Sequence, residues 1–235
     1  MFPTSANCGV VIPCHNEALW IAGVVRGARS YLEHVWVVDD GSEDGSSREA
    51  QEAGAIVLRH ERRRGKGAAL ATGWRAADQA GLEWVILMDG DGQHVPADLP
   101  VFLEPGRTER LLIGDRMAAA GTMPWLRRWA NRGLSQAISQ LVGRDLPDSQ
   151  CGFRRLHLPS LNRLELRSEQ FEIESELCVA FARAGFSIGS VPVQVRYGSG
   201  VSKINPVVDG WRWYRWYLSE RRRETVPRSA SIQRP

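Results

Sequence analysis

The stretch from Val85 to His94 constrains the fold of this chain most strongly, because a short apolar run ends there in two carboxylates. Residues 85–88 are all apolar, and a run of this length predicts a buried strand rather than a helix. Asp89 and Asp91 then lie where the strand leaves the core, which is where open α/β sheets bind ligands. Hard divalent cations prefer such carboxylate oxygens. A metal site is one interpretation, and a plain Asp/Gly turn after a strand is the other.

The N-terminal half repeats the same alternation of short apolar runs and amphipathic stretches. Strands are expected at residues 8–12, 35–38 and 55–58, and helices at 18–31, 43–53 and 65–80, the second with Asp or Ser at its cap. Strands that alternate with helices form βαβ units, which build a mainly parallel sheet flanked by helices. The pattern predicts an α/β fold of the Rossmann-like kind.

Polar residues follow three of these strands, so their side chains are expected at one crevice. The sequence Pro13-Cys14-His15-Asn16-Glu17 follows the first strand, and Asp39-Asp40 follows the second. A strand-end carboxylate can accept a hydrogen bond from a ribose hydroxyl or a nucleobase N–H. Helix capping is the alternative for Asp39 or Asp40. We give helix capping more weight for one of these two carboxylates than for both together.

The glycine-rich stretch around Lys66 does not match either familiar phosphate-binding motif. His60 stands where a P-loop needs Gly, and Gly67 stands where it needs Ser or Thr. No G-x-G-x-x-G follows the first strand, which argues against a nucleotide hydrolase and a dinucleotide oxidoreductase. Glycines flank Lys66 on both sides, so we place it near the ligand; the neighbouring arginines are expected to form a solvated basic edge.

Composition sets the class of the protein. With 235 residues and 43% hydrophobic content, the chain suits one sizeable α/β domain. The net charge of +3 argues against a dedicated nucleic-acid binder. Four cysteines without C-x-x-C spacing, no signal-like N-terminus and no long apolar stretch predict reduced thiols, a cytoplasmic location and no membrane span.

Several motifs in order resemble the inverting family 2 glycosyltransferases, whose fold is called GT-A, and more particularly the polyprenyl-phosphate sugar synthases such as dolichyl-phosphate mannose or glucose synthases. The resemblance covers about residues 8 to 205. The motifs that carry it are Pro13-Cys14-His15-Asn16-Glu17, Asp39-Asp40-Gly41-Ser42, Gly65-Lys66-Gly67, Asp89-Gly90-Asp91-Gly92-Gln93-His94, Gly114-Asp115-Arg116, Asp148-Ser149-Gln150-Cys151-Gly152-Phe153-Arg154, Phe171-Glu172-Ile173-Glu174, Arg196 and Ser202-Lys203.

The resemblance implies a role for each matching position. Asp89, Asp91 and Gln93 are expected to bind a divalent cation, Mg²⁺ or Mn²⁺, that assists departure of the nucleoside diphosphate. Residues expected to bind the nucleotide sugar are Pro13, His15, Asn16, Glu17, Val38, Asp39, Asp40, Lys66, Met88, Asp89, Gly90, Asp91, Arg116, Arg196 and Lys203. The loop at 197–203 is expected to close over the nucleotide. His15 stands where relatives often carry Tyr.

Catalysis and acceptor binding are assigned to a smaller set. The expected catalytic residues are Asp91, Arg116 and Asp148, and the expected acceptor-binding residues are Arg128, Asn131, Ser149 and Gln150. A carboxylate such as Asp148 can take the acceptor proton in an inverting displacement. A phosphate acceptor is already anionic, so Asp148 can instead position a neighbour, and a turn residue after Pro147 is the structural alternative.

Two Trp/Arg-rich stretches suggest a membrane surface. Trp125 and Trp129 are spaced by four on an expected helix ending at Val142, with arginines between and after them. Residues 211–235 hold seven Arg and two Glu, a net +5. Trp beside Arg suits a lipid headgroup layer, although an ordinary packed helix with a basic tail, or nucleic acid, would fit the C-terminal stretch.

The sequence therefore predicts a GT-A catalytic domain over residues 1–205, followed by an amphipathic Trp/Arg-rich helix and basic tail over 206–235. The expected function is transfer of a monosaccharide from a nucleotide-diphosphate sugar to a polyprenyl phosphate, peripherally on the inner face of a membrane. A family 2 enzyme with a soluble or glycan acceptor is one alternative, and a non-catalytic nucleotide- or membrane-binding module is another. The base, the sugar and the oligomeric state are not set by these motifs.

Overall fold

The computed structural model describes residues 2–117, 123–196 and 206–225. The chain divides into two units, Met1–Val201 and Ser202–Pro235. The first unit holds a seven-stranded sheet, and the described element of the second is a single long helix, α8 (Pro206–Thr225). No helix within the described ranges is both long enough and apolar enough to cross a bilayer.

The strands of the first unit are short, and most are apolar and buried, although β6 (Arg154–His157) has the sequence Arg-Arg-Leu-His and β3 (Ile56–Arg59) is partly exposed. They are β1 (Cys8–Cys14), β2 (Val35–Asp39), β3 (Ile56–Arg59), β4 (Trp84–Leu87), β5 (Leu111–Asp115), β6 (Arg154–His157) and β7 (Ile188–Pro192). Their spatial order is β3-β2-β1-β4-β6-β5-β7. All pairs are parallel except those of β6, which runs antiparallel to both β4 and β5. The mainly parallel sheet predicted from the sequence is confirmed, and the reversed strand β6 was not predicted.

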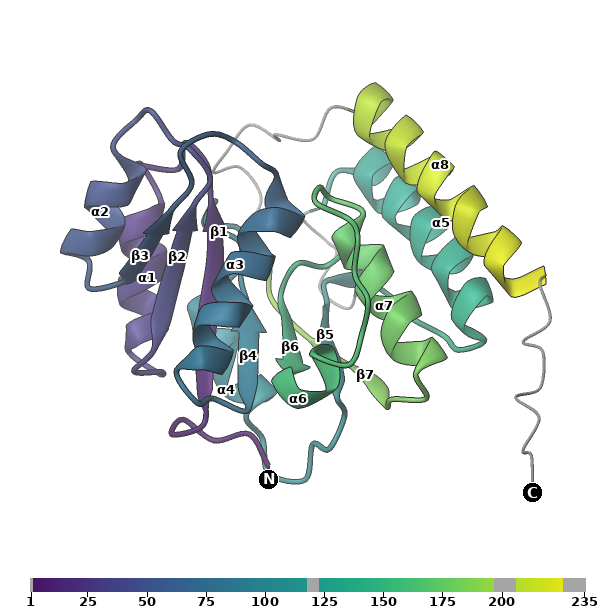
Figure 1. Cartoon of the computed structure of the whole chain (residues 1–235), viewed down its shortest axis with the longest axis horizontal. Helices are drawn as coiled ribbons and strands as arrows, with labels where there is room; N and C mark the ends of the chain where they lie inside the picture. The colour runs from purple at the N-terminus through teal and green to yellow at the C-terminus, as the bar shows by residue number, and fades with distance from the viewer. Residues whose placement is uncertain (1, 118–122, 197–205, 226–235) are drawn as a thin grey trace, which may run out of the picture. The chain divides into compact units, whose positions relative to one another are not determined.

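Helices cover the sheet. They are α1 (Ile21–Arg29), α2 (Ser46–Glu52), α3 (Lys66–Gln79), the 3₁₀ turn η1 (Pro96–Asp98), α4 (Leu99–Phe102), α5 (Trp125–Val142), α6 (Leu158–Leu161) and α7 (Ile173–Arg183). Figure 1 shows α3 crossing in front of the sheet and α1 behind it. Helix α3 fits closely because Gly73 faces Val11 and Val38, where a Cβ would lie 2.3 Å from a methyl group of Val11.

Amphipathic periodicity explains why these segments become helices. In α1 the buried residues Ile21, Val24, Val25 and Ala28 recur at three- and four-residue spacing, which forms one apolar stripe against the sheet. Helix α2 begins later than expected, at Ser46, and its cap is Gly45 with φ of 88° rather than an Asp or Ser side chain. Glycine tolerates the left-handed backbone of this position. The Asp44 side chain nevertheless accepts from the Ser46 N–H at 3.1 Å, so an Asp bonds the start of α2 although it is not the N-cap residue.

The strand order places the functional edge. The chain runs outward from β1 through β2 to β3, returns along α3 and adds β4 on the other side of β1. The direction of winding therefore reverses between β1 and β4, and such a switch point opens a crevice at the carboxyl ends of the strands. The register pairs Val11 with Leu87 and Cys14 with Asp39, so the segments after β1, β2 and β4 leave the sheet beside one another.

The cysteines and the core fit the expected reduced protein. All four cysteines are buried and none forms a disulfide. Burial raises the pKa of Cys8 and of Cys151 to about 12, which keeps both thiols protonated. The cysteines therefore act as small apolar core residues.

Candidate active site

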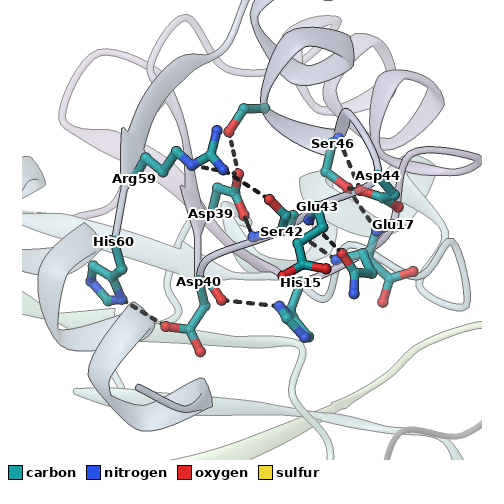
Figure 2. A network of polar contacts seen from close by, with 12 residues as sticks. His15, Glu17, Asp39, Asp40, Ser42, Glu43, Asp44, Ser46, Arg59 and His60 are labelled. Atoms are coloured by element: carbon teal, nitrogen blue, oxygen red, sulfur yellow. Dashed lines mark hydrogen bonds and ion pairs between the residues drawn. The ribbon is translucent and has the colours of Figure 1, made fainter. Parts of the chain in front are cut away.

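One group of polar residues at the functional edge, which we call the Asp39–Asp40 cluster, follows β1 and β2. Its members are His15, Asn16, Asp39, Asp40, Ser42 and His60. Figure 2 shows His15 and His60 both turned toward Asp40. His15 Nδ1 donates to the Asp40 carbonyl oxygen at 3.0 Å, and Asn16 holds the next turn by accepting from the Glu43 N–H at 2.9 Å. The segments after β1 and β2 are thus tied together by hydrogen bonds.

The Asp40 carboxylate is buried and accepts three hydrogen bonds. Its donors are the backbone N–H groups of Arg64 at 2.8 Å and Gly65 at 2.7 Å, together with His60 Nδ1 at 2.7 Å. The other ring nitrogen of His60 lies 2.9 Å from the hydroxyl of Thr72 on α3. Asp40 therefore holds the loop that leads into α3, and His60 is a residue of this cluster that sequence reasoning missed.

The neighbouring Asp39 carboxylate is fully buried. It accepts from the Ser42 N–H at 2.8 Å and from the Ser47 hydroxyl, and Arg59 Nε lies 3.8 Å from it. Both carboxylates thus hold local backbone, although only one was expected to do so. Contact of either with a nucleotide stays a prediction.

A second group, which we call the Asp89 cluster, surrounds the carboxyl end of β4. Its members are Lys66, Asp89, Arg116, Asp148 and Glu174. Lys66 Nζ lies 2.6 Å from Asp89 Oδ1 and 2.6 Å from Glu174 Oε1. Burial opposes charge on Asp89, but the Lys66 ammonium and the more distant Arg116 overcome it and lower the pKa of Asp89 to about 2. The carboxylates of Asp89 and Glu174 hold the pKa of Lys66 above its ordinary value, although burial acts to lower it.

Arg116 and Asp148 form the second ion pair of this cluster. Arg116 Nε donates to Asp148 Oδ2 at 2.7 Å, Nη2 donates to Oδ1 at 2.9 Å, and the Arg116 backbone N–H also donates to Oδ2 at 3.1 Å. The planar guanidinium therefore meets the carboxylate with two parallel bonds. Asp148 is only 2% exposed, so its charge is directed at Arg116 rather than at solvent.

The turn after β4 is held from within. The Asp89 N–H donates to His94 Nδ1 at 3.1 Å, and the Gln93 N–H donates to Asp91 Oδ1 at 3.0 Å. Burial lowers the pKa of His94 to about 4, so the ring is neutral at pH 7 and can accept this bond. The Gln93 carbonyl accepts from the Arg196 N–H at 2.9 Å, which brings the expected phosphate ligand Arg196 beside the turn.

A buried arginine joins the loop after Asp148 to α7. Arg154 is fully buried and donates to the carbonyl oxygens of Ser149 at 3.1 Å, Cys151 at 2.9 Å and Glu174 at 2.8 Å. Gly152 in this loop lies directly against Asp89, because a Cβ there would be 2.6 Å from Asp89 Oδ2. The loop thus fixes the position of both Asp89 and Glu174.

The remaining predicted residues lie in several parts of the fold. Val38 and Met88 are fully buried, which leaves their side chains in the core, whereas Pro13, Glu17 and Gly90 lie at the ends of β1 and β4. Ser149 is buried and bonded to Ser135 of α5, and Gln150 donates to Ser149 and to Ser175 of α7. Arg128 and Asn131 lie on α5. Lys203 and the expected closing loop at 197–203 lie outside the described residues.

Glu174 was part of a quoted motif but was not expected at the site. The signal was the Phe171-Glu172-Ile173-Glu174 sequence, in which two carboxylates precede and open a buried helix. His94 was similarly present in the motif after Asp89. No local pattern predicts that His60 lies at the site, because its partner Asp40 is 20 residues away in the sequence.

The two carboxylates of the Asp89-Gly90-Asp91 turn can serve a hard divalent cation. Within the described residues, no three or more His, Cys, Asp or Glu side chains gather in a way that would hold a metal by themselves. Mg²⁺ and Mn²⁺ sites of the substrate-bridging kind need only one or two carboxylates, with substrate phosphate and water completing the coordination. Asp89 and Asp91 fit that donor set.

Comparisons with known proteins identify the family and the fold. Residues 9–164 match the model of the family described as "Glycosyl transferase family 2". An undecaprenyl-phosphate mannosyltransferase of Micrococcus luteus is 30% identical over 86% of this chain and 92% of its own length. A UDP-N-acetylglucosamine–dolichyl-phosphate N-acetylglucosaminyltransferase of Methanococcus voltae is 28% identical over 80% and 85%. The Mycobacterium tuberculosis glucosyl-3-phosphoglycerate synthase, crystallised with Mn²⁺, UDP and phosphoglyceric acid, superposes with a TM-score of 0.70 at 21% identity, covering 95% of this chain and 80% of that one.

Proposed function

The chain belongs to glycosyl transferase family 2 and is a glycosyltransferase that uses a nucleotide-sugar donor, and we propose that it transfers a monosaccharide to a polyprenyl phosphate at a membrane surface. The observation that carries the proposal is the Asp89 cluster, where three carboxylates and two cations meet at the switch point of the sheet. Relatives whose names state a polyprenyl-phosphate acceptor, aligned along most of their length, support the choice of acceptor.

Asp89 and Asp91 are the residues that would hold a divalent cation, with Gln93 as the further expected ligand. Such an ion, when bound, stabilises the negative charge on a departing nucleoside diphosphate. The chain itself supplies two more positive charges there, on Lys66 and Arg116. Both carry a charge suited to phosphate oxygens, Lys66 as a mobile point charge and Arg116 as a guanidinium that Asp148 already orients.

Asp148 is better suited to orienting Arg116 than to removing a proton. Both of its oxygens accept from the Arg116 guanidinium, and its side chain is fully buried. A phosphate acceptor needs no base, because its oxygen is already anionic at neutral pH. Asp148 has both oxygens paired with Arg116, and an anionic phosphate does not need it as a base. The site therefore favours a phosphate acceptor over a sugar hydroxyl.

The Asp39–Asp40 cluster is proposed to hold the base and ribose of the donor. His15, Asn16 and Glu17 line the same edge after β1, beside the loop that Asp40 organises. Because Asp40 bonds the backbone of Arg64 and Gly65, any ligand contact there is coupled to the entry of α3 and hence to Lys66. This places the nucleoside end and the diphosphate end of the donor on adjoining strand ends.

Helix α5 offers the surface proposed to meet the membrane. Trp125 is 79% exposed and Trp129 is 74% exposed, with Leu126 beside them at 61%. Arg127, Arg128 and Arg132 lie along the same helix. Large exposed aromatic side chains with neighbouring arginines match the headgroup layer of a bilayer, where rings sit at the interface and guanidinium groups meet lipid phosphate.

The activity is tested by nucleoside diphosphate release from a panel of UDP- and GDP-sugars with Mg²⁺ or Mn²⁺, with and without a short-chain polyprenyl phosphate. We expect release that depends on the metal and on the lipid phosphate, with a glycolipid as product. Release that depends on a soluble acceptor instead would overturn the choice of acceptor. No release with any donor would overturn the proposed donor chemistry.

Membrane attachment is tested by flotation of the full chain with anionic phospholipid vesicles. We expect a W125A/W129A variant to float less, because it loses two interfacial rings. Leu19 provides a matched control, since it is 89% exposed but lies in the loop before α1. L19S should float as the unaltered chain does. Equal flotation of both variants would remove α5 from membrane contact.

A further inference from the structure

Lys66 has an unusual position for a basic residue. It is the first residue of the 14-residue helix α3, where the helix dipole disfavours positive charge. Its side chain is only 13% exposed. Lys66 is also one of only two lysines in a chain whose Lys and Arg total 30. A buried cation at a helix N-terminus needs nearby negative charge to stabilise it. The residue at this position is Lys, which is much rarer in this chain than Arg.

The compensation comes from two carboxylates distant in sequence. Asp89 Oδ1 and Glu174 Oε1 each lie 2.6 Å from the same Lys66 nitrogen. An ammonium group has three rotatable donors and can bridge two carboxylates or leave one of them, whereas a guanidinium binds as a rigid fork. The choice of Lys therefore suits an ion pair that must be exchangeable.

The backbone around Lys66 is fixed by close packing against the segment that precedes α7. A Cβ on Gly67 would lie 2.3 Å from the Ser168 carbonyl oxygen, and one on Gly65 would lie 2.4 Å from the Gln170 side chain. The Ala68 N–H donates to the Glu169 carbonyl at 3.1 Å. These contacts hold the start of α3 against the segment before α7, so the backbone of Lys66 stays close to Glu174.

Both oxygens of Asp89 are engaged by the protein. Oδ1 pairs with Lys66 Nζ, and Oδ2 packs so closely against Gly152 that a methyl group on that glycine would not fit. The Asp89 side chain is nevertheless 27% exposed, so it can be reached from the crevice. A cation that approaches Asp89 therefore meets a carboxylate already neutralised by Lys66.

We propose that Lys66 competes with the divalent cation for Asp89, and that Glu174 retains Lys66 when the cation takes its place. This inference rests on the proposed role of Asp89 as a metal ligand. Glu174 lowers the cost of exchange, because Lys66 keeps one buried ion pair after it leaves Asp89. The displaced ammonium remains in the crevice, next to the proposed position of the donor diphosphate. Metal entry and phosphate binding by Lys66 are then coupled in one step.

The test is Mn²⁺ binding by the full chain without nucleotide, measured from the electron paramagnetic resonance signal of free Mn²⁺. In K66M, Asp89 and Glu174 lose their internal counter-ion, so we expect Mn²⁺ to bind about 10- to 100-fold more tightly. This is the size of change that outer-shell partners make in metal affinity, here with the opposite sign because Lys66 opposes the metal. In E174Q, Lys66 is left with Asp89 alone, so we expect weaker Mn²⁺ binding. The two substitutions therefore have opposite expected signs.

The matched controls are K66R and R59M. K66R keeps the charge and should not tighten Mn²⁺ binding. R59M removes a cation from another strand-end carboxylate, Asp39, at 3.8 Å, and should leave Mn²⁺ affinity unchanged. Thermal unfolding of each variant identifies any that fails to fold, and E174Q provides the readout if K66M is unstable.

Mn²⁺ binding by K66M that equals or falls below that of the unaltered chain would overturn the inference, as would tighter binding by E174Q. Titration in the presence of UDP separates this result from the proposed function. If the unaltered chain binds Mn²⁺ with UDP but K66M shows no gain, only the competition is wrong. If the unaltered chain fails to bind Mn²⁺ even with UDP, Asp89 is not a metal ligand and the inference falls with it.

Discussion

The Asp39–Asp40 cluster and the Asp89 cluster lie at the same edge of one sheet but neutralise their carboxylates in different ways. Asp40 accepts from two backbone N–H groups and a histidine, and Asp39 accepts from a backbone N–H and a hydroxyl. Asp89 and Asp148 are instead held by the full charges of Lys66 and Arg116. The first cluster is thus built of hydrogen bonds that order the backbone, and the second of ion pairs between side chains.

The difference indicates what each cluster can exchange. Backbone hydrogen bonds to Asp40 cannot be given up without moving the entry of α3, so this region suits a fixed recognition surface. Ion pairs can be replaced by other ions, because a metal can stand in for Lys66 and a phosphate for a carboxylate. We therefore expect substitutions in the Asp89 cluster to affect activity and those in the Asp39–Asp40 cluster to affect stability.

The largest expected effect is on activity in D89N. Asn keeps the shape of the side chain but removes the charge that attracts both Lys66 and a divalent cation, so we expect turnover to fall about a thousandfold. Sugar transfer at saturating donor is the measurement. Asp78→Asn, at the exposed far end of α3, should stay within about twofold of the unaltered enzyme. Substantial activity in D89N would show that the ion pair there is structural.

The next effect is expected in D148N, which replaces a two-bond ion pair by a weaker neutral contact with Arg116. We expect kcat/KM to fall about a hundredfold because the guanidinium is no longer held in place. Asp145→Asn is the control, since Asp145 is exposed in the same loop. If Asp148 only orients Arg116, the pH profile of the residual activity should keep its shape. Loss of the acidic limb, where a general base becomes protonated as pH falls, would instead make Asp148 a base.

A stability effect of about 2 kcal/mol is expected in D40N. Asn offers one acceptor oxygen where Asp40 receives the N–H groups of Arg64 and Gly65 as well as His60, and its own amide would face a donor. Urea unfolding measures the loss. D89N should lose less, because Lys66 keeps its bond to Glu174. The reverse order of stability would contradict the division between the two clusters.

The smallest effect concerns pH and lies at the other end of β4. His157 pairs with Trp84, and burial, followed by the charge of Arg110, lowers its pKa to about 4. The unfolded chain then takes up a proton first as pH falls below about 6.5, so stability declines from there toward pH 4. We expect about 1.8 kcal/mol less stability at pH 5 than at pH 7 from this residue.

The H157N variant checks this assignment by urea unfolding at both pH values. Asn can still accept from the Ser160 N–H, as His157 does at 3.2 Å, but it does not titrate. The decline between pH 7 and pH 5 should therefore shrink. An unchanged decline would mean that groups other than His157 cause the loss of stability in acid. If those groups belong to the Asp39–Asp40 or the Asp89 cluster, the contrast drawn between the two clusters would be weaker.

The sequence alone determined the fold class and the edge at which the site lies. Short β-branched runs such as Cys8–Cys14, alternating with amphipathic stretches, permit a mainly parallel sheet and little else. Polar residues directly after such strands must lie at its carboxyl edge, which is why Asp39, Asp40 and Asp89 could be assigned to one crevice. These inferences depend only on periodicity and on chain direction.

Only the tertiary structure decided which charges meet. Lys66 and Glu174 are separated by 108 positions, and no local pattern predicts that packing around Gly65 and Gly67 will bring α3 and α7 together. The sequence also did not predict that β6 runs antiparallel to its neighbours, because four buried residues carry no signal of strand direction. Periodicity reports which face of an element is buried, whereas ion pairs between elements depend on how those elements pack, and that is fixed by the whole fold.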